Sequence, residues 1–213
     1  AANYIFEPSS LPWATDLGEM ILPSRLFDLD GLRVGVIGLG NISSLNSIYD
    51  ESNSMGIKVL EPEDIVPAEA ARLKSQGADL IVVVSHMGVH SDQEHARWIP
   101  EIDLIIGGHH HVALDPPLVV ENEQTGKRVP VVHSGAFSKF VGRLDLVVRD
   151  GAILSHEYTL RPVWNVQNED GDWLLNRKPE VVDILEEYQE QLDQKYVTTQ
   201  VIGYAEEVLR RYG

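Results

Sequence analysis

Three histidines that follow two hydrophobic segments are the residues of this sequence best suited to chemistry. His86 follows the apolar run 80–84, and His109 and His111 follow the apolar run 104–106. Neutral imidazole is the commonest metal ligand in proteins, and two ligands two residues apart can reach the same ion or adjacent ions. The pattern favours a metal site over a solvent-exposed polar turn.

Two glycines separate the second hydrophobic run from its histidines. Gly107 and Gly108 have no Cβ, so they let the backbone approach other groups closely. His110 lies between the two candidate ligands and is expected to point away from them, so we do not expect it to bind metal.

A strand–helix–strand order positions these residues. A helix is predicted between the two strands, with Ser91 and Glu94 as a capping box. The place of Asp92 in the first helical turn accounts for that residue. Strands joined through a helix run parallel and end at the same edge of a sheet, so His86 and His109 should lie close together.

The remaining histidines carry weaker signals. His133 ends a strand, and its sequence fits a residue that supports metal ligands as well as it fits plain structure. His90, His95 and His156 are expected to be surface or core residues without chemistry. Asp103 begins its strand and lies at the wrong end, so no carboxylate is seen to complete the site.

Composition excludes several classes of protein. The 213 residues carry a formal net charge of −16, which disfavours binding to a nucleic acid polymer. A small phosphorylated ligand remains compatible, because a metal ion can supply local positive charge. The sequence has no cysteine, which excludes thiolate metal sites. No apolar run approaches the roughly 18 residues of a membrane span.

The pattern of elements predicts the α/β (α+β) class. Asp30-Gly31 and Asp150-Gly151 are hairpin signals. Asp64 is expected to cap a helix that runs to about residue 76. Further expected elements are a short strand at 2–6, an antiparallel meander of strands at 117–120, 129–133, 142–148 and 153–160, a helix at 179–196 and an element starting at Val201.

The motifs around the histidines resemble a known family. Ser85-His86-Met87-Gly88, followed by Gly107-Gly108-His109-His110-His111, resembles the calcineurin-like metallophosphoesterases of the 5′-nucleotidase type. Segments 131–135 and 142–146 are supporting matches. The resemblance implies a β-sandwich flanked by helices, present here in part as residues 1–163. Residues 164–213 would be a connector and a linker helix toward a separate C-terminal domain.

The resemblance also implies a chemistry. Two divalent ions (Mn, Zn, Fe or similar) would clamp a phosphate and activate a bridging water for in-line attack. His86 and His109 would bind one ion and His111 the other. The expected substrate is a nucleotide or a similar small phosphate ester, and the family suggests an exported, periplasmic or extracellular protein.

Several family motifs are absent from the sequence. It contains no Asp-x-His, no Gly-Asp-x-x-Asp with the bridging aspartate and no Gly-Asn-His-Glu. We therefore expect the C-terminal half of a catalytic domain, inactive alone, whose partner is the missing N-terminal half. Two alternatives stay open: a non-catalytic metal-binding or interaction module of the same fold, and a sulfur-ester hydrolase of the same superfamily.

Overall fold

The computed structural model describes residues 2–6, 21–41, 57–163, 170, 178–196, 200, 201, 203 and 204. Contacts divide the chain into two units, Ala1–Trp164 and Asn165–Gly213. The roles that the sequence assigns to the two parts stay predictions.

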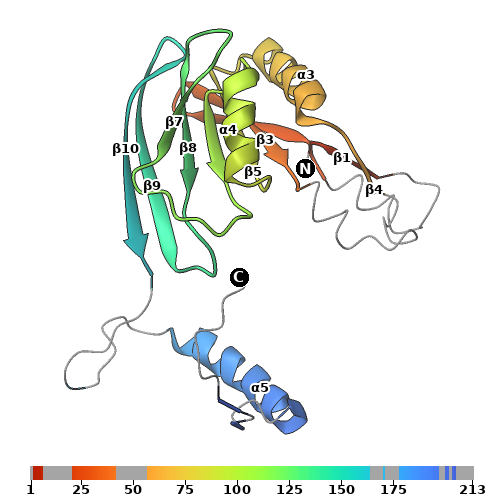
Figure 1. Cartoon of the computed structure of the whole chain (residues 1–213), viewed down its shortest axis with the longest axis vertical. Helices are drawn as coiled ribbons and strands as arrows, with labels where there is room; N and C mark the ends of the chain where they lie inside the picture. The colour runs from red at the N-terminus through yellow and green to blue at the C-terminus, as the bar shows by residue number, and fades with distance from the viewer. Residues whose placement is uncertain are drawn as a thin grey trace. The chain divides into compact units, whose positions relative to one another are not determined.

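A six-stranded mixed sheet forms the centre of the first unit (Figure 1). Its order is β2-β3-β5-β6-β8-β7, and β3, β5, β6 and β8 run parallel, while β2 and β7 are antiparallel to their neighbours. The strands are β2 (Ser24–Leu29), β3 (Leu32–Leu39), β5 (Leu80–Ser85), β6 (Leu104–Gly107), β7 (Leu118–Glu121) and β8 (Arg128–His133). The predicted parallel pairing of β5 and β6 is confirmed.

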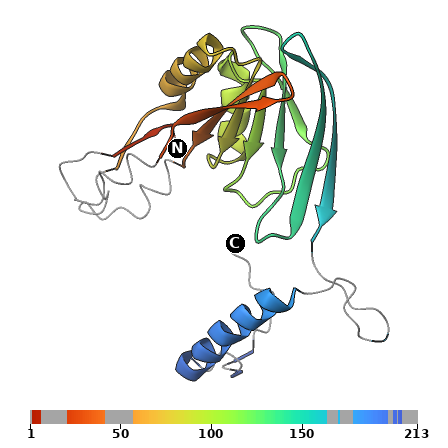
Figure 2. The ribbon, with the colours of Figure 1, turned by 180° about the vertical axis from the view of Figure 1, so that it is seen from behind.

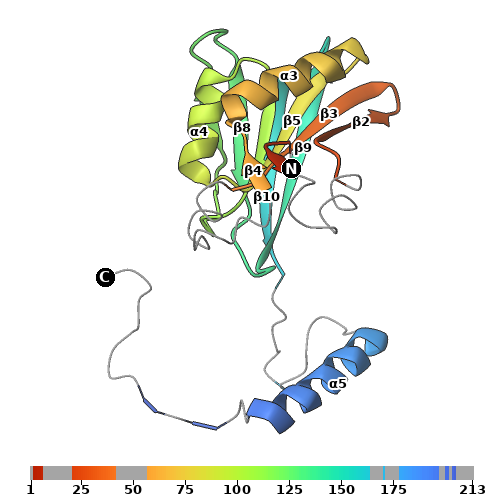
Figure 3. The ribbon, with the colours of Figure 1, turned by 90° about the vertical axis from the view of Figure 1, so that its right-hand side faces the viewer.

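Helices α3 (Pro62–Ser75) and α4 (Val89–Trp98) cover one face of this sheet (Figure 3). The strands present alternate apolar residues to them, as period-two side chains must. The resulting core contains fully buried Ile37, Val66, Leu73, Ile81, Val83, Ile105, Val129 and Val131.

A hairpin of β9 (Phe140–Arg149) and β10 (Ala152–Pro162) packs against the opposite face (Figure 2). A cavity of about 250 Å³ lies between the two layers, lined by Ile106 and Val132 of the sheet and Leu144 and Tyr158 of the hairpin, among others. The described chain therefore has the α/β layers that the sequence predicts.

A short strand pair lies beside the end of β3. β1 (Tyr4–Phe6) pairs antiparallel with β4 (Ile57–Val59). Asn3 and Gly40 exchange two hydrogen bonds of 2.8 Å, which tie this pair to the carboxyl end of β3. The predicted short strand near the beginning of the chain is confirmed at Tyr4–Phe6.

Both predicted hairpin turns have the expected backbone. Asp30 and Gly31 have φ of 53° and 95°, and Asp150 and Gly151 have φ of 50° and 72°. Positive φ at two central residues is the signature of the turn type that matches strand twist.

Both predicted helix starts are wrong by three residues. α3 begins at Pro62 rather than after Asp64, because the fixed φ of proline suits the first helical position. α4 begins at Val89 rather than after Ser91, because Gly88, with φ of 97°, turns the chain directly into the helix. The predicted capping box is therefore not formed, and Ser91 lies inside the helix.

The predicted antiparallel meander is also wrong in part. β7 and β8 form an antiparallel pair, but β8 lies next to β6 and parallel to it. β9 and β10 pair with each other in a sheet of their own. Pairing between distant segments overrides the neighbour-to-neighbour order that local patterns suggest.

In the second unit, helix α5 spans Pro179–Tyr196, as predicted. Its apolar stripe is largely exposed within the described residues, with Leu185 at 62% and Tyr188 at 65%. The element expected from Val201 lies mostly outside the described residues. Among the described helices, none is long and apolar enough to cross a membrane.

One buried histidine should make the stability of the fold depend on pH. His95 of α4 is 5% exposed, and burial lowers its pKa, an effect that nearby carboxylates, first among them Glu63, partly oppose. The unfolded chain binds a proton near pH 6.5 and the folded chain resists it, so the stabilising contribution is present above about pH 6.5 and is lost as pH falls below it. We expect His95→Gln to reduce the fall in the free energy of unfolding between pH 7.5 and pH 5.5, measured by urea titration.

His90, which is exposed on the same helix, supplies the control. His90→Gln should keep the pH dependence of the unsubstituted chain. An unchanged pH dependence in His95→Gln would contradict the assignment.

Candidate metal site

The carboxyl ends of β5 and β6 bring two of the predicted ligands together. The ring centroids of His86 and His109 lie 5.2 Å apart, with an interplanar angle of 70°. Their closeness follows from the parallel strands, as the sequence predicts. Gly108 leaves room for this arrangement, because a Cβ on it would lie 3.1 Å from His86 Nδ1.

The spacing of these two rings fits a shared metal ion. Two imidazoles bound to one zinc ion at a tetrahedral angle, with Zn–N bonds of about 2.1 Å, have ring centroids about 5 Å apart. The observed 5.2 Å agrees with that requirement. The described residues contain no group of three His, Asp or Glu side chains placed to hold one ion.

His111 and His110 have other neighbours. The ring of His111 packs edge-on against Phe137, with centroids 4.9 Å apart. His110 Nδ1 accepts a hydrogen bond of 3.1 Å from the Val89 N–H, so this ring caps the first turn of α4. His109 and His111 have positive φ angles of 80° and 58°. Positive φ at both residues bends the chain sharply on either side of His110, so the three rings have different neighbours.

A buried polar cluster lies directly beneath the histidine turn. The Asp92 carboxylate accepts hydrogen bonds from the Ser85 hydroxyl and from His133 Nε2, the latter at 2.7 Å. Exposure is 0% for Asp92, 5% for Ser85 and 2% for His133. Gly107 closes the cluster from above, since a Cβ on it would lie 2.0 Å from His133 Nε2.

The role that the sequence suggests for Asp92 is therefore incomplete. Asp92 does lie in the first turn of α4, but its carboxylate faces the strand ends rather than solvent. The sequence signal that could have revealed this buried position is Gly88. Its positive φ lets α4 begin at Val89, and the helix then turns the Asp92 side chain toward the sheet. His133 lies in the cluster beneath the turn, and a supporting role for it stays a prediction.

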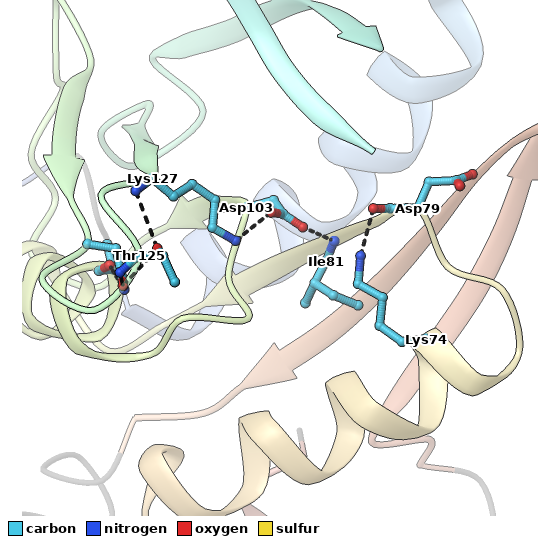
Figure 4. A network of polar contacts seen from close by, with 8 residues as sticks. Lys74, Asp79, Ile81, Asp103, Thr125 and Lys127 are labelled. Atoms are coloured by element: carbon cyan, nitrogen blue, oxygen red, sulfur yellow. Dashed lines mark hydrogen bonds and ion pairs between the residues drawn. The ribbon is translucent and has the colours of Figure 1, made fainter. Parts of the chain in front are cut away.

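A second buried aspartate lies at the other end of the same strands (Figure 4). Asp103 accepts a hydrogen bond of 2.7 Å from the Ile81 N–H and forms an ion pair of 2.7 Å with Lys127. This carboxylate is far from the histidine turn, as the sequence predicts. It accepts the hydrogen bond of a backbone N–H near the start of β5.

Comparisons with known proteins find similarity to proteins named 5′-nucleotidase. No protein-family model matches the chain. It is 30% identical over 209 residues to protein 5NUC of Lutzomyia longipalpis, covering 87% of this chain and 32% of that protein. It is 32% identical over 165 residues to a 5′-nucleotidase of Vibrio cholerae, covering 66% of this chain and 30% of that protein.

A solved structure shows the same fold. The 5′-nucleotidase precursor from Thermus thermophilus superimposes with a TM-score of 0.70 at 24% identity, covering 95% of this chain and 39% of that chain. This chain is a relative of the 5′-nucleotidases. The predicted resemblance is confirmed, and the chain spans about a third of the length of protein 5NUC and of the Vibrio cholerae 5′-nucleotidase.

The close fit of Gly107 in this 5′-nucleotidase relative gives a first test of the site. In Gly107→Ala the new methyl group would meet two buried and hydrogen-bonded side chains, at 2.0 Å from His133 and 2.2 Å from Asp92. We expect a loss of about 1–3 kcal/mol in the free energy of unfolding, measured by urea titration.

Gly108→Ala is the matched control for this prediction. Its methyl group would lie 3.1 Å from the exposed ring of His86, which can move, and 3.6 Å from the Ser85 carbonyl oxygen, an ordinary contact distance. Equal losses of stability in the two variants would contradict the prediction, because they would show that the buried Asp92–His133 contact does not limit the space at Gly107.

Proposed function

We propose that this chain contributes three metal ligands to a phosphoesterase that hydrolyses nucleotides or similar small phosphate esters with two divalent ions. The observation that carries the proposal is the meeting of His86 and His109 at the carboxyl edge of parallel strands, with ring centroids 5.2 Å apart. The sequence similarity to proteins named 5′-nucleotidase supports the choice of nucleotide substrates.

Each histidine has a separate task in this proposal. His86 and His109 hold one ion, and His111 reaches the second. His110 keeps the turn against α4 through the Val89 N–H, so that its neighbours face the opposite side. When bound, divalent ions supply positive charge that clamps phosphate oxygens and makes a bound water more acidic.

Metal binding by the two adjacent histidines is the most direct test. We expect His86→Ala and His109→Ala each to weaken binding of Zn²⁺ or Mn²⁺ by about tenfold or more, measured by isothermal titration calorimetry on the 213-residue chain.

His156 on β10 and His90 on α4 are the controls. Alanine at either position should leave the affinity unchanged, because neither residue is one of the proposed ligands; the ring of His90 packs on His110, which is not a proposed ligand either. Loss of affinity in a control, or none in both ligand variants, would contradict the assignment.

We infer that the chain alone does not catalyse the reaction. Three neutral imidazoles without a bridging carboxylate bind metal weakly and leave a pair of ions unbridged. We expect no turnover of an aryl phosphate such as p-nitrophenyl phosphate with added Mn²⁺. Robust turnover by the isolated 213 residues would overturn this inference, while leaving the ligand assignment to the calorimetric test.

We also propose that the whole protein is exported. Two of the relatives are snake venom 5′-nucleotidases, a setting outside the cell. Detection of the whole protein in the cytosolic fraction of its own cells would contradict this proposal.

A further inference from the structure

Asp92 is a buried carboxylate that the proposed chemistry does not use. It is 0% exposed, and its two oxygens take hydrogen bonds from two different strands. Ser85 is the last residue of β5 and His133 the last residue of β8. Asp92 itself belongs to α4, so one carboxylate joins three elements that surround the end of β6.

The first hydrogen bond controls the residue after β5. The Ser85 hydroxyl donates to Asp92 and accepts a hydrogen bond of 3.0 Å from the Met87 N–H. These contacts fix the backbone on both sides of His86. Loss of these contacts would therefore release the Ser85 side chain and the Met87 backbone on either side of His86.

The second hydrogen bond controls the strand that carries the histidine turn. His133 pairs with Gly107 in the parallel ladder, just before the turn. Its carbonyl accepts a hydrogen bond of 2.9 Å from the Leu114 N–H, and the Gly135 N–H donates to the Val112 carbonyl at 3.0 Å, both after the turn. The end of β8 thus holds the chain before and after the three histidines.

We propose that Asp92 is a positioning residue for the metal site: through Ser85 it orients His86, and through His133 it orients the turn that carries His109. The proposal rests on the proposed function for its purpose, but the positioning itself concerns the metal-free chain.

Asparagine cannot replace the carboxylate in this position. A carboxylate only accepts, so both the Ser85 hydroxyl and His133 Nε2 can donate to it. Asparagine offers one acceptor and one amide donor, and one contact must then be broken or reversed. Reversal at His133 would place a hydrogen on Nδ1, which is buried and has no hydrogen-bond partner among the described residues.

The test compares Asp92→Asn with Asp103→Asn in the metal-free 213-residue chain. Both aspartates are buried and have two partners, but they lie at opposite ends of the same strands. We expect both variants to unfold at lower urea concentration. Only Asp92→Asn should weaken the proton NMR cross-peak between the rings of His86 and His109 by more than half.

Metal affinity gives a second measurement on the same variants. We expect Asp92→Asn to raise the Zn²⁺ concentration at half-saturation by about 10- to 100-fold, the usual effect of removing a group that orients a ligand. Asp103→Asn should change it less than twofold. An equal loss in both variants would overturn the proposal, because it would show a general effect of lower stability.

A conservative pair of variants covers the case in which Asp92→Asn does not fold. His133→Gln keeps an N–H donor for Asp92, while His133→Leu removes it. The cross-peak and the affinity should survive in His133→Gln and be lost in His133→Leu, and equal behaviour of the two would overturn the proposal. If the unsubstituted chain binds no Zn²⁺, the proposed function fails, while the ring cross-peak still decides the role of Asp92.

Discussion

A carboxylate sealed beneath the ends of parallel strands is the constraint on which this structure depends. Asp92 has no access to water, so its oxygens must find donors inside the protein. Leaving such a group without a partner is among the most destabilising changes in a core. β5, β8 and α4 must therefore converge at one point, and the histidine turn of β6 lies over that point.

The sheet uses the same solution at both of its ends. A strand that begins or ends leaves backbone N–H groups without a neighbouring strand, and these groups need other acceptors. Asp103 serves the Ile81 N–H at the amino ends. At the carboxyl ends the Ser85 hydroxyl serves the Met87 N–H and is itself held by Asp92. The difference is that the second arrangement has imidazoles above it.

The sequence predicts the part of the site that depends on local connection. A strand, a short helix and a second strand imply parallel pairing, and parallel pairing brings His86 and His109 to one edge. The positions of the α5 helix and of both Asp-Gly turns follow from equally local signals. These features need only the order of elements and their hydrophobic periods.

The buried cluster could not be predicted in this way, for two physical reasons. A helix that starts at Ser91 would present Asp92 at its first, exposed turn, whereas the start at Val89 turns that side chain toward the strands. The insertion of β8 beside β6 is a contact between distant segments, and no local pattern encodes it. Only the combination of both places His133 against Asp92.

The attachment of β8 on both sides of the histidine turn has a thermodynamic consequence. Gly107 pairs with β8 before the turn; after the turn, Leu114 bonds to His133 at the end of the same strand and Val112 to Gly135 just beyond it. The ends of this loop are closed by the fold itself, so the conformational entropy of ordering it is lost during folding rather than during ligand capture. Under the proposed function, an ion bound by these histidines would find the backbone already arranged by the fold, and its binding energy would not be spent on arranging the chain.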